Sequence, residues 1–176
     1  PAPARMRALE DRCVKLGRNY RVTGGPRFYE RIEIGDAMAA FRLVAQPADD
    51  LAFERISNTP KRGLGDTTVR ALHDYARARD IPMLAAAADM IETDELKPRV
   101  RSTLRALTES FSRWARLVEA QPHSEVAKAI LEESGYVEMW QKDRSADAAD
   151  SLEHLKEFVR SMDELPAMEA FLVHVS

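Results

Sequence analysis

The residues of this chain best suited to chemistry form a basic turn, Thr59-Pro-Lys-Arg-Gly-Leu-Gly-Asp-Thr-Thr68. Two glycines flank a single apolar residue, so the backbone can turn tightly and its amide N–H groups are not shielded by side chains. A helix that begins after this turn adds unpaired N–H groups and the positive end of its dipole. The turn therefore predicts a pocket for an anion, and we expect that anion to be a nucleic-acid phosphate, bound without regard to base sequence.

Backbone amides and small hydroxyls of the turn would bind successive phosphates, as in a helix–hairpin–helix, and the two cations would raise the local positive potential. The predicted DNA contacts are Thr59, Lys61, Arg62, Gly63, Leu64, Gly65, Thr67 and Thr68. Asp66 is predicted to be the N-cap of the following helix, with its carboxylate turned back onto the amides of that helix. An alternative stays open, in which the two glycines only permit positive φ in a connector between helices.

The sequence contains no complete active site. A nucleotide-binding loop of the form G-x-x-x-x-G-K-[ST] is missing, and so is the G-x-S-x-G pattern of a serine nucleophile. The four histidines have no metal-ligand spacing with one another or with Cys13, which is interpreted as a small residue on a helix face. We therefore expect no cofactor and no metal in this chain, and no enzymatic activity from it alone.

Composition describes an ordinary globular protein, with 45% hydrophobic and 31% charged residues. No apolar run approaches the roughly 20 residues that span a bilayer, so no membrane is expected as a partner. A single cysteine excludes an internal disulfide and is typical of a cytoplasmic protein. The net charge of −3 combines +5 over residues 1–79 with −8 over residues 80–176, an asymmetry that is compatible with a local nucleic-acid face but is also common on solvated surfaces. The apolar stretch 171–175 so near the end predicts a segment of a longer protein.

Apolar residues recur at helical spacing along most of the chain, which predicts a mainly α helical bundle. A helix is expected over residues 4–16, and a small β element near the N-terminus over residues 20–22. A turn at residues 24–26 follows, and Phe28-Tyr29 would continue the extended stretch. The longest predicted helix covers residues 97–119. It carries an apolar stripe of Val100, Leu104, Leu107, Phe111, Trp114 and Val118. This stripe predicts the central helix of a bundle, with a coiled-coil seam as the alternative.

Several residues predict where helices begin and end. Asp49 or Asp50 is expected to cap a short helix before the glycine turn. Asp150 and Glu153 resemble a capping box, and Pro166 suits the first turn of a last helix.

Residues 20–36, Tyr-Arg-Val-Thr-Gly-Gly-Pro-Arg-Phe-Tyr-Glu-Arg-Ile-Glu-Ile-Gly-Asp, resemble the signature Y-R-x-x-G-G-x-x-F-F-E-R-x-E-I-K-D of UvrD/PcrA/Rep-type superfamily 1 DNA helicases. The likeness continues through residues 41–43, 49–56 and 58–66, and it returns at 152–155 and 170–172. It is specific over residues 20–66 and loose from about 80 to 150. Three positions depart from the family pattern: Gly35 replaces a lysine, and Ala148 and Ser151 stand where arginine and asparagine are usual.

This resemblance implies a piece of such a helicase. Residues 1–45 would belong to the edge of the second RecA-like domain, subdomain 2A, with a strand-turn-strand and a linking helix. Residues 46–176 would form the α-helical accessory subdomain 2B, which in this family contacts duplex DNA ahead of the fork. The parent protein would hydrolyse ATP with magnesium, move 3′ to 5′ on single-stranded DNA and serve in DNA repair. Its partners would be DNA at a duplex junction, the rest of the motor, and repair or transcription proteins.

A second hypothesis comes from the long predicted helix and the acidic C-terminal half. Phe111 and Trp114 on that helix could instead serve a protein-interaction or autoregulatory module with no direct contact to DNA. The turn motivates the first hypothesis and these aromatic residues motivate the second.

Overall fold

Helices make up the regular structure of the part of the chain that the computed structural model describes: residues 4–9, 11, 12, 14 and 27–175, with side chains as far as 163. Residues 4–9 are helical, as predicted. The later helices are α2 (Arg27–Glu30), α3 (Ile32–Ala45), α4 (Asp50–Ile56), α5 (Asp66–Arg79), α6 (Met83–Met90), α7 (Pro98–Ala120), α8 (His123–Glu133), α9 (Tyr136–Lys142) and α10 (Ala148–Val175). The predicted mainly α fold is confirmed.

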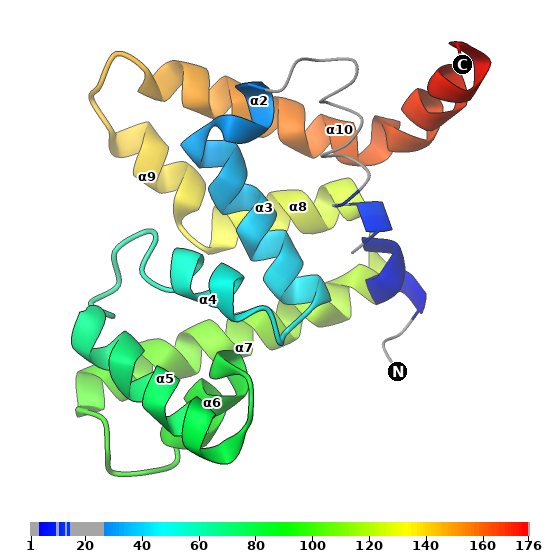
Figure 1. Ribbon diagram of the computed structural model, residues 1–176. Helices are drawn as coiled ribbons and strands as arrows, with labels where there is room; N and C mark the ends of the chain where they lie inside the picture. Colours follow the sequence, from blue (N-terminus) through cyan, green and yellow to red (C-terminus); the bar gives the residue numbers. More distant parts are fainter. Residues whose placement is uncertain (1–3, 10, 13, 15–26, 176) are drawn as a thin grey trace.

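Helix α3 lies at the centre of the bundle and contacts α4, α7, α8 and α10. Its sequence is apolar on nearly every side, as a helix enclosed by others requires. Ile34, Phe41 and Leu43 on this helix are completely buried. Figure 1 shows α5 and α6 at one end of the molecule and α10 at the other, with α3 and α7 between them. The core is therefore continuous from the glycine turn to the last helix.

The long helix α7 confirms the prediction for residues 97–119 to within one residue at each end. Five residues of its apolar stripe are buried, and Val100 is half-buried at the start of the helix. The rings of Phe111 and Trp114 meet edge to face with centroids 5.0 Å apart. Both rings belong to the core of this molecule, so α7 is a central bundle helix and these two residues offer no surface to a partner.

Aspartates at the start of α4 have two different functions. Asp49 is the N-cap, and its Oδ1 accepts a hydrogen bond from the Ala52 amide at 3.0 Å. Asp50 Oδ1 instead accepts a bond from the Met83 amide at 2.9 Å. The second bond ties α4 to the beginning of α6, so only Asp49 confirms the capping prediction.

The predicted extended stretch at Phe28-Tyr29 is wrong, because both residues belong to the short helix α2. Their rings pack edge to face at 5.3 Å, and Phe28 also meets the His154 ring on α10 at 6.1 Å. Packing against α10 thus outweighs the β propensity of two aromatic residues. No strand occurs among the described residues, and the predicted elements at 20–22 and 24–26 lie outside them.

Helix α10 begins earlier and ends later than its sequence signals predict. It starts at Ala148, and the Ser151 amide already donates to the Asp147 carbonyl at 3.0 Å. Asp150 therefore lies inside the first turn, and the predicted capping box with Glu153 is wrong. The helix continues through position 166 to Val175, so Pro166 does not begin a separate helix. Nowhere in the described chain is a helix both long and apolar enough to cross a membrane.

Candidate nucleic-acid interface

The glycine turn connects α4 to α5 through residues 57–65. Asn58 organises it, because its Oδ1 accepts hydrogen bonds from the Arg62 amide at 2.6 Å and the Leu64 amide at 3.2 Å. The Leu64 side chain is 2% exposed and anchors the turn to the core. Gly63 has a φ of +80°, a left-handed conformation that favours glycine. The turn is thus a shaped element with one apolar anchor.

Arg62 binds the protein itself. Its Nη1 donates to the carbonyls of Ile56 and Ser57, both at 3.0 Å, and to that of Pro60 at 3.2 Å. Its Nη2 donates to the Ser134 carbonyl at 3.1 Å, at the end of α8. Burial lowers the pKa of this guanidinium. Arg62 therefore joins the ends of two helices, and its predicted contact with DNA stays a prediction.

The Leu64 side chain is in the core and its amide is bound to Asn58, so both groups are used within the protein. The Thr59 hydroxyl also turns back, donating to the Arg55 carbonyl at 3.2 Å. The sequence analysis missed the function of Asn58 as the acceptor that shapes the turn. The signal was present, because a side-chain carbonyl shortly before a glycine turn commonly binds the amides of that turn.

Five predicted contact residues remain at the surface: Lys61, Gly63, Gly65 and Thr67 are exposed, and Thr68 is half-buried. Within the described chain, the amides of both glycines and both threonines have no hydrogen-bond acceptor. Thr67 and Thr68 are in the first turn of α5, where the helix dipole adds positive potential. Within the described residues, the turn thus offers one exposed lysine and several backbone donors without an acceptor.

The N-cap of α5 is Gly65, with φ −77° and ψ −175°, and no side chain caps the helix. The prediction that Asp66 is the cap is wrong, because the extended backbone of Gly65 already occupies that position and Asp66 is the first helical residue. A Cβ built on Gly65 would meet nothing within 4 Å. The fold therefore has no steric need for glycine here, and its absent side chain leaves the amides open to solvent.

A shallow hollow of about 540 Å³ lies beside the turn. Its walls come from the turn, from the junction between α8 and α9, and from α9 itself. Lys61 and Lys142 both line it, and Lys142 forms an ion pair with Glu138 at 2.8 Å. Lys61 has no ion-pair partner in the described part of the chain.

A buried polar cluster joins α3 to α4 and α9, the helices on either side of the turn and its neighbouring hollow. Asp36 on α3 accepts a hydrogen bond from the Tyr136 hydroxyl at 2.6 Å and one from Arg55 Nε at 2.9 Å. Burial and the neighbouring Asp36 carboxylate raise the pKa of Tyr136 above its usual range. A Cβ on Gly35 would lie 2.1 Å from Arg55 Nη2. Glycine at position 35 therefore makes room for the arginine that reaches Asp36 and holds α4 against α3.

A second polar contact joins α3 to α10. Glu33, 4% exposed, lies 3.2 Å from His154 Nδ1. Burial alone would raise the pKa of Glu33, but hydrogen bonds from its own backbone, from Ser151 and from His154 outweigh burial and lower it. Ser151, where the resembled family has asparagine, thus helps to stabilise a buried carboxylate. Among the described residues, no cluster of three His, Cys, Asp or Glu side chains could hold a metal ion.

Comparison with known protein families identifies the family of this chain. The model of the UvrD-like helicase C-terminal domain matches residues 4–171. The chain belongs to that family. This UvrD-like domain is 35% identical over 170 residues to a probable DNA helicase II homolog of Rickettsia conorii, covering 97% of the chain and 26% of the relative. It is 30% identical over 182 residues to DNA helicase II of Escherichia coli K12, covering 98% and 25%.

The ATP-dependent DNA helicase PcrA of Bacillus subtilis is 31% identical over 156 residues, 89% of the chain and 21% of that relative. The UvrD-like domain thus spans about a quarter of the length of the curated relatives that it matches. The predicted relationship to UvrD-type helicases is confirmed at the level of the family.

Proposed function

We propose that this chain is the accessory 2B domain, with the adjoining edge of subdomain 2A, of an ATP-dependent 3′–5′ DNA helicase. In this proposal the turn at 59–68 binds the backbone of duplex DNA during unwinding in DNA repair. The observation that carries it is the set of amides at Gly63, Gly65, Thr67 and Thr68, which have no acceptor among the described residues, in the same turn as the exposed Lys61. Such donors suit phosphate oxygens and carry no information about base sequence.

The turn supports a division of function among its residues. Asn58, Arg62 and Leu64 hold the shape, and the exposed amides and Lys61 would bind phosphates. Asn58 and Gly63 already define the backbone conformation of the turn, so its amides would need little further ordering to bind phosphate. Lys61 adds a mobile charge whose contribution falls as salt rises.

Catalysis would reside in the rest of the parent protein. Relatives of this chain are named DNA helicase II and ATP-dependent DNA helicase PcrA. The chain itself contains no phosphate-binding loop, so ATP and magnesium would bind outside it and the isolated chain would not hydrolyse ATP.

A salt titration of duplex binding tests the contribution of Lys61. We expect Lys61→Ala to weaken binding and to reduce the slope of log K against log salt by about 1, because one fewer phosphate is neutralised. Lys128→Ala is the matched control, since it removes the same charge from α8, where Lys128 lines a different hollow. If Lys61→Ala and the unsubstituted chain gave equal slopes, Lys61 would not be a DNA contact.

Gly65→Ser tests the backbone amides without changing the charge. A serine hydroxyl at this N-cap would accept a hydrogen bond from the Thr67 or Thr68 amide and would stabilise α5 by a few tenths of a kcal/mol. The same hydroxyl would compete with phosphate, so duplex binding should weaken by roughly tenfold while the salt slope stays unchanged. Full duplex affinity in a folded Gly65→Ser chain would contradict the proposal.

Asp66→Asn probes the carboxylate that stands next to the proposed phosphate site. Asp66 is exposed and caps no amide, so its charge should oppose binding. We expect the variant to bind duplex about threefold more tightly at low salt, with the difference shrinking as salt rises. If Asp66→Asn bound duplex more weakly, phosphate would not bind next to Asp66.

A further inference from the structure

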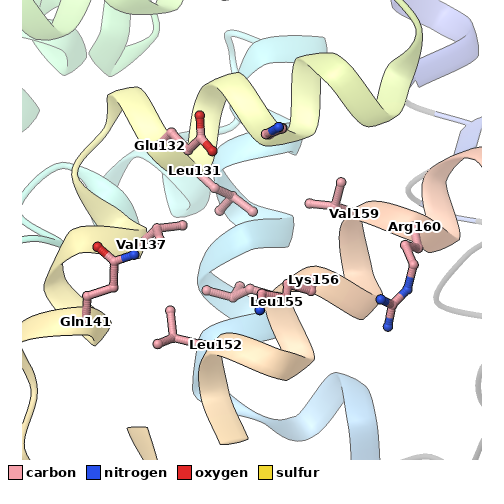
Figure 2. A pocket seen from close by; sticks show the side chains of 10 residues that line it. Leu131, Glu132, Val137, Gln141, Leu152, Leu155, Lys156, Val159 and Arg160 are labelled. Atoms are coloured by element: carbon pink, nitrogen blue, oxygen red, sulfur yellow. The ribbon is translucent and has the colours of Figure 1, made fainter. Parts of the chain in front are cut away.

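A groove of about 490 Å³ lies between α8, α9 and α10, and the proposed DNA contacts are not among its lining residues. Figure 2 shows the apolar side chains of all three helices converging on it. Leu131 comes from α8, Val137 from α9, and Leu152, Leu155 and Val159 from α10. Leu131 and Leu155 form a buried floor, whereas the other three are half-buried walls. The groove is thus apolar and open at the surface.

The rim of this groove is cationic. Lys128, Lys156 and Arg160 line it, and Glu132 is the single carboxylate among the lining residues. Lys156 forms an ion pair with Glu153 at 3.1 Å. Lys128 and Arg160 have no ion-pair partner in the described part of the chain. Two exposed cations therefore stand beside exposed apolar surface, in a half of the chain whose net charge is negative.

We propose that this groove binds an amphipathic helix of a partner protein, one with an apolar stripe and acidic residues on its flanks. The apolar stripe would fill the space between the three helices, and the acidic flank would face Lys128 and Arg160. This inference is independent of the DNA-binding turn, because the two surfaces share none of their lining residues.

The spacing along α10 sets the length of the contact. Leu152, Leu155 and Val159 are separated by three and four residues, so they form one stripe on that helix. At 1.5 Å per residue this stripe is about 10 Å long, which matches two turns of a docked helix. The partner would therefore present apolar anchors at positions i, i+3 or i+4, and i+7.

Three fluorescent helical peptides of about 15 residues test this proposal with the full chain by anisotropy. One carries leucines at i, i+4 and i+7 with glutamates on both flanks. The second has lysine in place of each glutamate, and the third has alanine in place of each leucine. We expect the acidic leucine peptide to bind with a Kd below about 100 μM and the other two to bind at least roughly tenfold more weakly.

Charge reversal on the rim provides the matched test. Lys128→Glu/Arg160→Glu changes only exposed side chains, so it should leave the circular dichroism spectrum unchanged. It should weaken the acidic peptide by about tenfold and strengthen the basic one. Lys61→Glu, at the glycine turn, is the control and should alter neither peptide while it weakens duplex binding.

Three results would overturn the proposal: no binding of the acidic peptide, equal binding of the acidic and basic peptides, or binding unaffected by rim reversal. Sedimentation velocity of the chain alone identifies the competing occupant. Self-association that is abolished by Val159→Asp would assign the groove to a second copy of this chain.

Discussion

The glycine turn and the α8–α9–α10 groove are built in opposite ways. At the turn, the Asn58 and Arg62 side chains bind main-chain groups, and the exposed Gly63 and Gly65 have amides without an acceptor in the described part of the chain. At the groove, the main chain is enclosed in helices and apolar side chains face the opening. The first surface suits a charged polymer backbone and the second suits another protein's side chains. One small domain thus presents two chemically distinct surfaces.

The difference also concerns what fixes each shape. The shape of the turn depends on a few hydrogen bonds, so a single substitution can disrupt it. The groove depends on packing shared among three helices, so a rim substitution should change binding but not folding.

Removing the Arg62 guanidinium, which holds the shape of the turn, should have the largest effect on stability. We expect Arg62→Ala to lower the free energy of unfolding by about 3 kcal/mol, since it removes the donor to four carbonyls, of which only that of Ile56 keeps another donor, the Thr59 amide. Urea denaturation measures this, and Lys61→Ala is the neighbouring control, with a change below about 0.5 kcal/mol. A fully stable Arg62→Ala chain that had lost duplex binding would instead make Arg62 a DNA contact.

Tyr136→Phe tests the support that the turn and the groove share, because Tyr136 begins α9 and its hydroxyl reaches Asp36. The variant deprives a buried carboxylate of one donor and should cost about 2 kcal/mol of stability. The salt slope of duplex binding should stay as in the parent chain, because no phosphate contact changes. A smaller loss in the double variant Tyr136→Phe/Asp36→Asn than in the single one would confirm that the cost comes from a buried charge that has lost one of its two donors.

The two glycines of the turn should respond differently to alanine. Gly63→Ala places a Cβ at φ +80° and should cost about 1 kcal/mol of stability. Gly65→Ala meets open space at an ordinary φ and should change stability by less than about 0.5 kcal/mol. Equal losses measured by thermal unfolding would mean that the turn has another backbone conformation in solution.

The smallest expected effect is the pH dependence from Glu33. Its pKa in the folded chain lies below the ordinary value of 4.5, so its stabilising contribution is complete above that pH. This contribution should disappear as the pH falls from 4.5 through the lowered pKa. Glu33→Gln should flatten that part of the stability profile measured by urea denaturation. Identical profiles for Glu33→Gln and the parent chain would contradict the assignment.

Much of the fold followed from the sequence, because helical periodicity depends on local spacing. The ends of α7 and the cap at Asp49 were predicted because their signals lie within one turn of the residues concerned. The helix at Phe28-Tyr29 was missed, since the contact of Phe28 with His154 on α10 involves residues more than 100 positions apart.

The candidate site was predicted as a location but not residue by residue. Gly63, Gly65 and Lys61 lie as expected at an exposed turn, because glycine and lysine there reflect local backbone geometry and solvation. The hydrogen bonds of Arg62 were not predicted, because its acceptor at Ser134 is 72 residues away and no spacing rule reveals it. The groove was also missed, since its walls come from three helices whose relative positions depend on tertiary packing.

The four carbonyls bound by Arg62 have a mechanical consequence. One guanidinium bridges the end of α4 and the end of α8, and α8 also supplies Lys128 and Leu131 to the groove. A force that a bound duplex exerted on the turn would therefore be transmitted to α8 through the hydrogen bonds of Arg62. Such a force on the bound duplex would then change the shape of the α8–α9–α10 groove.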